Sequence, residues 1–505
     1  MRGVERPALR AAGRLRRRRS RRRRPGGRRR GDPPLSALPT TGPALPGTAA
    51  GRREAALADH RRRLDALVAQ YRAIPAGEPV RLAKRTSNLF RARDRATTPG
   101  LDVAAFDGVL WVDPDARVAE VGGMTTYEHL VDATLPHGLM PLVVPQLKTI
   151  TLGGAVTGLG IESSSWRAGM PHESVLELEV LTGAGAVEVL HPGDGLFQAF
   201  PNSYGTLGYT TRLRIELAQV EPWVHLRHER FASVAALADR IAEVCAPGAT
   251  EADFVDGVVF SPEECYLTLA SFATSLPAGV TPSDYTGTEI FYRSIPARSD
   301  DWLSVRDYLW RWDTDWFWCS RAFGVQRRWV RRLLGPRWLR SDTYWKIKAL
   351  EDRHHLKARL DARRGLPPRE DVVQDVEVPL DRLAELMAGF AREVPISPVW
   401  LCPLRQRDPS ASWPLYSMRP DELYVNVGFW STCALAPGMD PAHHNRWVEA
   451  EVGRLGGRKS LYSTAFYDEP TFWSLYGAEA YWAAKRAADP DGRLLDLYAK
   501  CVRGR

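Results

Sequence analysis

The chain has 505 residues, 44% of them hydrophobic and 26% charged, which predicts a globular protein of two to four domains and excludes a largely disordered one. The net charge of +9 is no guide to a nucleic-acid surface, because the first 32 residues hold fifteen Arg against only Glu5 and Asp32. That segment carries +13 and the remainder −4, which excludes a basic surface over the whole protein.

We expect residues 1–50 to be a disordered, Arg-rich leader and linker. The tail could touch anionic lipid or nucleic acid, or be a weakly constrained leader with a start codon placed too far upstream. Neither a signal peptide nor a spanning helix is predicted, since no apolar h-region follows the basic run and no window of about 18 residues is apolar. Six scattered Cys without CxxC spacing indicate a reducing compartment, no structural zinc and a cytoplasmic protein.

Regular structure is predicted to begin with a helix over residues 54–71, where apolar residues fall near helical spacing. Two short strands follow at 108–113 and 117–123, and Thr125 with Glu128 fits a capping box at the start of the next helix. Residues 174–190 alternate apolar residues with Glu and predict a half-exposed β-hairpin. Residues 210–217 predict another strand with one wet face. Helices and strands mix without a βαβ rhythm, which indicates an α+β fold.

The composition of the sequence changes at about residue 221, from where long segments mix polar and apolar residues, and we place the start of a second domain there. Eight of the seventeen Trp lie between Trp302 and Trp345, among clustered Arg. Residues 301–346 could contact a membrane surface, line an apolar substrate tunnel or pack between domains. A site for single-stranded nucleic acid is the least favoured interpretation.

The stretch TLGGAVTGLGIES, residues 151–163, contains four Gly. The first interpretation is a run of tight turns that need positive φ. The second is a cradle for a diphosphate, since backbone without Cβ lets N–H groups close on phosphate oxygens. Neither GxxxxGK[ST] nor a helix-opening GxGxxG is present, so the sequence predicts neither a P-loop nor a nicotinamide Rossmann site.

Three segments in order, TLGGAVTGLGIES, HESVLELEVLTGAGAVEVL and LFQAFPNSYGTLGYTTRLRIEL, resemble the PCMH-type FAD-binding domain of the vanillyl-alcohol oxidase / p-cresol methylhydroxylase family. Within it the sequence is most similar to the Δ24-sterol reductase (diminuto/dwarf-like) branch, also through VVQDVEVPL, PVWLCPL and ELYVNVG. The resemblance implies a two-subdomain FAD-binding domain over residues 51–220, an α+β cap (substrate) domain over 221–460, and a C-terminal segment, 461–505, that returns toward the flavin.

By this resemblance FAD is the cofactor, with residues 151–163 around its diphosphate and residues 203–208 along it. The segment KRTSNLF (84–90) stands where relatives carry their first FAD loop, but it lacks their RGGGH form and any His or Cys, so we expect FAD to be held non-covalently. The residues expected to contact FAD are Asn88, Thr151, Leu152, Gly153, Gly154, Ala155, Val156, Thr157, Gly158, Leu159, Gly160, Ile161, Glu162, Ser163, Ser203, Tyr204, Gly205, Thr206, Leu207 and Gly208.

The same resemblance implies reduction of an isolated carbon–carbon double bond of a lipid, with hydride from flavin N5, a proton from an acid on the cap domain, and NADPH as the donor. Our first choice for the acid is Asp375, whose pKa an apolar lid would raise; the alternative is a solvent-facing residue of an amphipathic strand. Strand alternation sends its neighbour Gln374, also a candidate, to the opposite face. Tyr462 and Tyr467 could donate a proton or stack on substrate, or simply pack in the core.

The substrate is left open between a Δ24 sterol side chain and a methylene-branched fatty acyl chain, because protonation of either alkene gives a tertiary cation. A lipid substrate and the Trp/Arg-rich segment together suggest peripheral contact with the inner face of the membrane. The alternatives are an FAD-dependent oxidase or dehydrogenase of an alcohol or sugar on the same fold, and a non-catalytic lipid-binding module.

Overall fold

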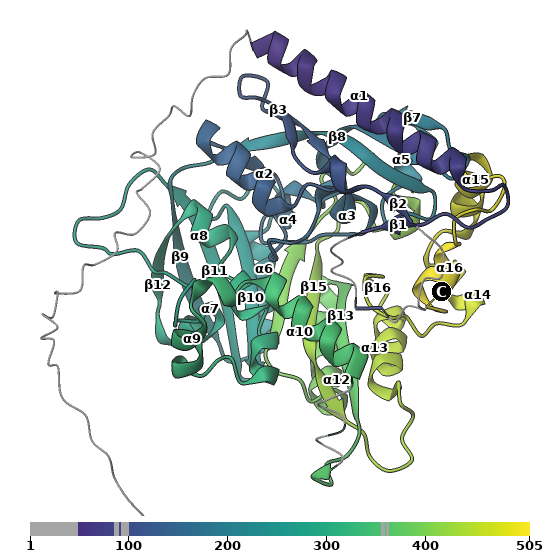
Figure 1. Ribbon diagram of the computed structural model, residues 1–505. Coiled ribbons are helices and arrows are strands. Elements are labelled where there is room, and N and C mark those ends of the chain that lie inside the picture. Colours follow the sequence, from purple (N-terminus) through teal and green to yellow (C-terminus); the bar gives the residue numbers. More distant parts are fainter. Residues whose placement is uncertain (1–48, 85–89, 92–99, 355–358, 360–362, 505) are drawn as a thin grey trace, which may run out of the picture. The chain divides into compact units, whose positions relative to one another are not determined.

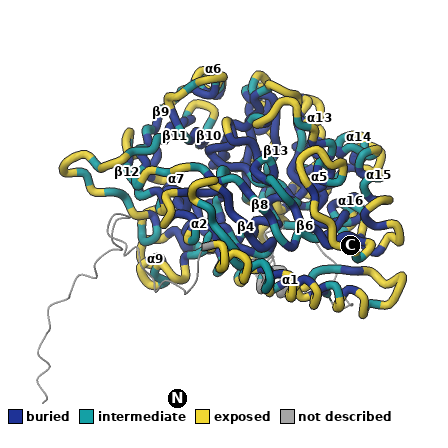
Figure 2. The backbone as a smooth tube through the Cα atoms, turned by 90° about the horizontal axis from the view of Figure 1, so that it is seen from above, coloured by how far each residue is buried: buried dark blue, intermediate teal, exposed yellow. Residues whose placement is uncertain are grey.

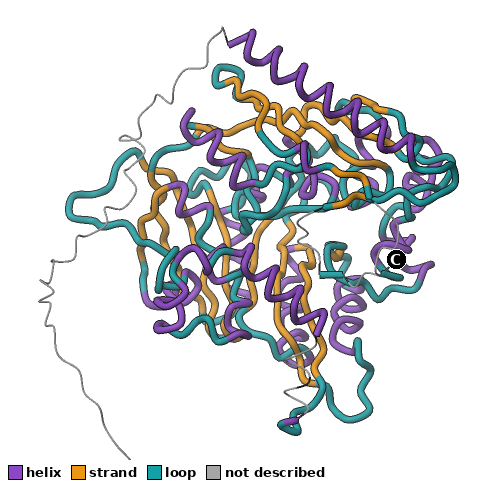
Figure 3. The backbone as a smooth tube through the Cα atoms, in the orientation of Figure 1, coloured by secondary structure: helices purple, strands orange, loops and turns teal. Residues whose placement is uncertain are grey.

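The structure of the chain is a computed structural model that describes residues 49–84, 90–91, 100–354, 359 and 363–504. The chain divides into Met1–Pro39 and Thr40–Arg505, and every element below belongs to the second unit. Figure 1 and Figure 3 show two large sheets in this unit, with helices around them. Within the described residues, no helix is both long and apolar enough to cross a bilayer.

The first half of the unit is built on a six-stranded sheet with the order β3-β4-β8-β6-β7 and β5 paired to β8. The strands predicted around residues 108–123, 174–190 and 210–217 all belong to it. Its strands are β3 (Val109–Asp113), β4 (Val118–Gly122), β5 (Leu139–Pro141), β6 (Val175–Thr182), β7 (Val187–Leu190) and β8 (Gly208–Gln219), and the parallel pair β1 (Leu82–Ala83) and β2 (Leu101–Asp102) lies outside it.

Helix α1 (Ala49–Ala73) lies across this sheet (Figure 1) and covers the face that the sequence predicts to be wet. His60 of α1 bonds the buried Glu179 of β6 at 2.6 Å, and Arg53 pairs with the buried Glu120 of β4. The prediction of an exposed face was wrong for Glu179, because it finds its partner on a helix far away in sequence, whereas β7 of the same hairpin is exposed as predicted. These ion pairs place charged side chains between helix α1 and the sheet.

The predicted helix start near residue 125 exists, but its cap is one residue later. The hydroxyl of Thr126 accepts the N–H of His129 and caps α2 (Tyr127–Thr134). Thr125 instead bonds the backbone of Gly108, and Glu128 pairs with Arg340. The capping box assigned to Thr125 and Glu128 was therefore wrong, because a long-range bond takes the first of two adjacent threonines.

The second half is built on an eight-stranded antiparallel sheet with the order β12-β9-β11-β10-β14-β15-β13-β16. Because β8 ends at Gln219 and β9 begins at Trp223, the chain changes sheet where we place the domain boundary; the division into domains stays a prediction. The strands are β9 (Trp223–Phe231), β10 (Phe254–Ser261), β11 (Glu264–Ala273), β12 (Asp300–Ser304), β13 (Arg369–Pro379), β14 (Val399–Leu404), β15 (Tyr424–Ala434) and β16 (Arg458–Lys459).

One face of this sheet is an apolar core covered by α6 (Val234–Val244), α12 (Leu383–Glu393) and α13 (His443–Arg454). Figure 2 shows the strands as buried and much of α6 as exposed. Strand alternation sends Val372, Val376 and Val378 into this core, and Asp375 and Glu377 to the other face. The second face is thus the polar one, and it carries Asp375, the first choice for the acid.

The remaining helices connect the sheets or close the C-terminal part. They are α3 (Leu152–Thr157), α4 (Ser165–Ala168), α5 (Gly195–Ala199), α7 (Phe291–Ser294), α8 (Val305–Leu309), α9 (Arg328–Leu334), α10 (Ser341–His354), α14 (Glu469–Leu475), α15 (Ala478–Ala488) and α16 (Leu497–Cys501). The composition of helices around antiparallel sheets confirms the predicted α+β class.

Candidate active site

The first half of the Gly-rich stretch is the short helix α3, and its N–H groups are already bonded to protein. Leu152 and Gly153 donate to the carbonyls of Thr125 and Gly123 at 2.9 and 3.0 Å. Gly154 donates to the hydroxyl of Thr151 at 3.2 Å. A Cβ on Gly153 would lie 2.5 Å from the carbonyl oxygen of Gly123, so this glycine is required by packing of backbone on backbone. In this structure the N–H groups of Gly153 and Gly154 have partners within the protein, and their contact with the diphosphate stays a prediction of the resemblance.

The second half of the stretch lies beside the other segment expected at the cofactor. Tyr204 donates its N–H to the carbonyl of Thr157 at 2.8 Å, and Asn202 donates to the carbonyl of Gly158 at 3.0 Å. Among the described residues no protein acceptor is recorded for the N–H groups of residues 159–161. These three groups, from Leu159, Gly160 and Ile161, are the part of the stretch still able to hold a phosphate.

None of the four Gly in the stretch, all of which the structure describes, has φ in the left-handed region. The positive φ values occur instead in the neighbouring loop, at Asn202 (61°), Tyr204 (51°) and Gly205 (75°). Two of these residues carry side chains, so the loop stores backbone strain next to the candidate site. Lys500 and Lys485 fix it from the C-terminal segment, by donating to the carbonyls of Tyr204 and Thr206 at 2.7 and 2.8 Å.

The last two residues of the stretch point toward the second sheet. The carboxylate of Glu162 accepts from the buried guanidinium of Arg311 at 2.8 Å, and Asp256 of β10 accepts from the same nitrogen at 2.9 Å. The hydroxyl of Ser163 bonds that of Tyr308 at 2.9 Å. Both side chains bond groups of the second half of the chain, while Oε2 of Glu162 is buried with no partner among the described residues; their contact with the cofactor stays a prediction.

Phe90 and Arg91, at the end of the segment expected as the first FAD loop, lie between the loop at Tyr204 and the neighbours of Asp375. The guanidinium of Arg91 lies 4.7 Å from the centre of the Tyr204 ring, and the N–H of Phe90 bonds the carbonyl of Tyr462 at 3.0 Å. Asn88 falls outside the described residues.

Asp375 sits on β13 with polar and aromatic neighbours on the same face. Asn426 of β15 donates to its carboxylate at 3.2 Å, and the indole N–H of Trp430 donates to the hydroxyl of Tyr462 at 2.8 Å. Burial raises the pKa of Asp375 to about 6, although hydrogen bonding with Tyr462, Asn426 and Trp430 opposes the rise. Gly428 stands opposite in register, where a Cβ would clash with the carboxylate. The site thus holds a half-buried carboxyl that titrates near neutral pH.

Further aromatic rings pack against Trp430 and Tyr462, the two aromatic neighbours of this carboxyl. The ring of Phe90 lies 4.8 Å from Trp430 and 6.1 Å from Tyr462, centre to centre. Phe317, from the Trp-rich segment, lies 5.1 Å from Trp430 and 5.4 Å from Trp400. Packing around the site is therefore one role of residues 301–346, and we call these five rings the aromatic wall.

The other two candidates lie elsewhere. The amide of Gln374 donates to Asn445 of α13 at 2.6 Å, on the opposite face of the sheet from Asp375, as strand alternation predicts. The ring of Tyr467 packs 6.1 Å from Tyr476, in the C-terminal segment. This contact is core packing, which was the alternative to a role of Tyr467 in proton donation or substrate stacking.

Sequence reasoning missed Asn426, Trp430 and Glu377. The first two alternate with Gly428 along β15, so a register prediction for β13 and β15 would have found them. Glu377 accepts from the hydroxyl of Tyr416, and burial raises its pKa well above the usual range. Because it shares a strand face with Asp375, the site holds two carboxyls, and the nearby Asp375 also raises the pKa of Glu377.

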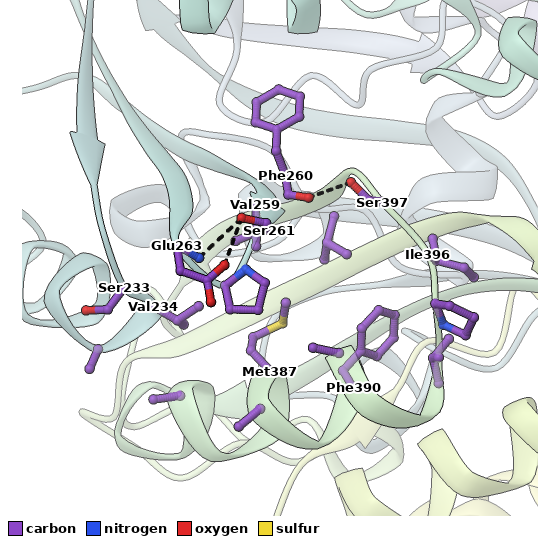
Figure 4. Close-up of a pocket in the computed structure, with 18 of the residues that line it drawn as sticks. Ser233, Val234, Val259, Phe260, Ser261, Glu263, Met387, Phe390, Ile396 and Ser397 are labelled. Carbon is purple, nitrogen blue, oxygen red and sulfur yellow. Dashed lines mark hydrogen bonds between the residues drawn. The ribbon is translucent and has the colours of Figure 1, made fainter.

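The second half of the chain also contains an apolar cavity of about 520 Å³, whose lining Figure 4 shows. Its lining comes from β10, α12 and the start of α6, and includes Val259, Met387, Phe390 and Ile396. Val259 and Phe390 belong to the apolar core on the far side of the sheet from Asp375. The cavity therefore does not bring a ligand to the candidate acid.

Several buried polar atoms of the site have no partner among the described residues, and they fit a bound FAD. They are Oδ1 of Asn202, Oγ of Ser203, Oγ of Ser463 and Oδ1 of Asn426. Ser203 begins the segment expected along the cofactor and Asn202 immediately precedes it, while the other two stand beside Tyr462 and Asp375. Leaving such atoms unpaired is costly, so a polar ligand at this place would satisfy them.

Comparison with known proteins agrees with this site. Residues 63–191 match the family described as "FAD binding domain". The chain is 25% identical to the Delta(24)-sterol reductase of Arabidopsis thaliana over 445 residues, covering 80% of this chain and 77% of that one. It is 23% identical to the human Delta(24)-sterol reductase over 405 residues, 78% and 75% of the two chains. It is 30% identical to cytokinin dehydrogenase 2 of rice (Oryza sativa subsp. japonica) over 160 residues, 30% and 28% of the two. The predicted resemblance and FAD as the cofactor are thus confirmed.

Proposed function

We propose that this FAD-dependent oxidoreductase reduces an isolated carbon–carbon double bond of a lipid. One observation carries the proposal: Asp375, whose pKa burial raises to about 6, lies among aromatic rings on the polar face of the second sheet. A proton donor within apolar surroundings is what an unpolarised alkene needs.

When bound, FAD supplies hydride chemistry at N5 of its isoalloxazine ring. The protein itself supplies the proton. The O–H bond of protonated Asp375 breaks as a C–H bond forms at the less substituted alkene carbon, which leaves positive charge on the other carbon. The faces of Trp430 and Phe90 attract such a charge. With one proton and one hydride added, the product has gained two hydrogens and the carboxylate recovers its proton from water.

The protein would hold FAD at the groups that remain free. Leu159, Gly160 and Ile161 offer backbone N–H groups to the diphosphate. Asn202 and Ser203 offer side-chain oxygens along the cofactor. Arg91 supports this loop through its contact with the ring of Tyr204. The two described residues at the end of the first FAD loop are Phe90 and Arg91, and neither can form a covalent link to the flavin.

Similarity to Delta(24)-sterol reductases supports a lipid alkene as the substrate class. A sterol side chain and a methylene-branched fatty acyl chain place the same demand on Asp375, since both form a tertiary cation. NADPH as the source of electrons belongs to the proposal, and so does peripheral contact with a membrane, where such a lipid resides.

The second candidate is oxidation of an alcohol or sugar. Its support is that a pKa of about 6 leaves most Asp375 ionised at pH 7, the form that a base requires. Similarity to a cytokinin dehydrogenase over 160 residues also supports this candidate.

The two candidates differ in what restores the oxidised flavin. Purified protein is reduced with NADPH without oxygen, and a lipid extract is then added while the visible spectrum is followed. The proposal predicts reoxidation by the extract, with a lipid that gains two hydrogens. Reduction by an alcohol, indifference to lipid and rapid reoxidation by air would favour the second candidate instead.

A further inference from the structure

Helix α9 turns two of its apolar side chains to solvent, while Leu334 at its end packs against the buried cluster that contains Trp316. Trp329 and Leu333, one helical turn apart, are 63% and 79% exposed, and Trp338 in the short helix that follows, Pro336–Trp338, is 54% exposed. By contrast Trp312 and Trp316, earlier in the same Trp-rich segment, are fully buried. Three large exposed apolar residues within ten positions form a patch rather than scattered single residues.

A buried arginine attaches this helix to the protein. In a helix of the core, packing of an apolar face would do this instead. The guanidinium of Arg331, 1% exposed, donates to the carbonyls of Gly287 at 2.8 Å, Thr314 at 3.0 Å and Glu289 at 3.3 Å. Residues two positions apart in a helix point to nearly opposite sides, so anchoring Arg331 inward directs Trp329 and Leu333 outward. Their exposure follows from how the helix is attached.

Exposed cations frame the patch. Arg327, Arg328, Arg332 and Arg337 are all exposed, and within the described part of the chain none of them is in an ion pair. The chain outside its first 32 residues has a net charge of −4, so this concentration of positive charge is local. Tryptophan with arginine is the combination that suits the headgroup layer of a bilayer, where the ring is half buried and the guanidinium meets phosphate.

We propose that α9 and residues 336–338 form a docking surface for an anionic phospholipid membrane. Trp329, Leu333 and Trp338 enter the headgroup boundary, and the four arginines bind lipid phosphates. The same segment reaches the candidate active site, because Thr314 accepts from Arg331 while Phe317 belongs to the aromatic wall. This surface gives a place to the membrane contact that belongs to the proposed function, and its benefit, access to a lipid alkene, rests on that function.

The test uses the full chain and vesicles of equal parts phosphatidylglycerol and phosphatidylcholine, with brominated acyl chains that quench nearby Trp emission. The Arg-rich leader contains no Trp, so it can bind vesicles without contributing to quenching. We expect quenching in the wild type and its loss in the variant Trp329→Ser/Leu333→Ser/Trp338→Ser, with affinity falling roughly tenfold or more. A variant with Gln at the four arginines should lose the Trp quenching in the same way, although its leader can still bind the vesicles.

The matched control is Val189→Ser/Leu495→Ser, which removes two exposed apolar side chains elsewhere and should behave as the wild type. Equal quenching of wild type and triple variant, or none in the wild type, would overturn the proposal. Self-association or nucleic-acid binding that is lost in the triple variant, without vesicle quenching, would assign the surface to another partner and overturn it as well. Reduction of detergent-dispersed lipid, measured on the same samples, reports separately on the reaction.

Discussion

Replacing Asp375 by Asn tests the candidate acid by both activity and stability. The pKa of this carboxyl rises from 3.8 to about 6, so its ionised form is disfavoured in the folded protein by about 3 kcal/mol. The sign follows from linkage: the folded state holds the proton more tightly, so stability from this group is full below pH 3.8 and is lost as pH rises to about 6. Asp375→Asn should remove up to that cost above pH 6.

The substitution should therefore make the protein more stable at pH 7 while it abolishes turnover. General acid catalysis is worth roughly 10²–10⁴-fold, and we expect a loss of that size with flavin retained. In the wild type, kcat/KM for the alkene should fall as pH rises above about 6, since only roughly one-tenth of the carboxyls keep a proton at pH 7. That decline should be absent in the variant.

The assays are alkene turnover across pH 5–9, the flavin absorbance of the purified protein, and thermal denaturation at pH 4 and pH 7. Asp371→Asn is the control, because this exposed residue of the same strand should change neither activity nor stability. Near-normal turnover of Asp375→Asn, or a lower denaturation temperature at pH 7 than the wild type, would refute the reasoning.

Three further substitutions test other parts of the site. Tyr462→Phe removes a hydroxyl that lowers the pKa of Asp375, so the alkaline fall in kcat/KM should move to higher pH; an unmoved or lower apparent pKa contradicts this. Gly153→Ala places a Cβ 2.5 Å from the carbonyl oxygen of Gly123 and should cost about 1–3 kcal/mol and lower flavin content, whereas equal stability to wild type in denaturant titration would disprove the close approach. Arg311→Met leaves two buried carboxylates unpaired and should destabilise by about 3–5 kcal/mol, less at pH 5 than at pH 8; a loss that does not depend on pH would argue against the ion pairs.

The sequence predicted the elements whose pattern is local. Alternation of apolar residues with Glu was enough for the hairpin of β6 and β7, and helical spacing for α1. It could not show that α1 covers the charged face of the sheet, because the bond of His60 to Glu179 joins residues 119 positions apart. A wet face and a face covered by a partner of opposite charge have the same sequence pattern.

The candidate site divides in the same way. Alternation along β13 correctly sends Asp375 and Gln374 to opposite faces, and the resemblance pointed to this strand. The rings that give the site its apolar character come from three distant segments, represented by Phe90, Phe317 and Trp430, and only the folded chain brings them together. The glycines of residues 151–163 serve two needs that spacing does not separate, close backbone packing at Gly153 and free N–H groups near Gly160.

A single turnover of reduced enzyme tests the central claim most directly. Protein reduced with dithionite is mixed without oxygen with a Δ24-unsaturated sterol or a methylene-branched fatty acid, and the flavin spectrum and the mass of the lipid are recorded together. We predict that one of the two lipids restores the oxidised flavin and gains two hydrogens in wild type, and that Asp375→Asn leaves both flavin and lipid unchanged. Flavin that stays reduced with both lipids and is reoxidised only by air would contradict the assignment as an alkene reductase.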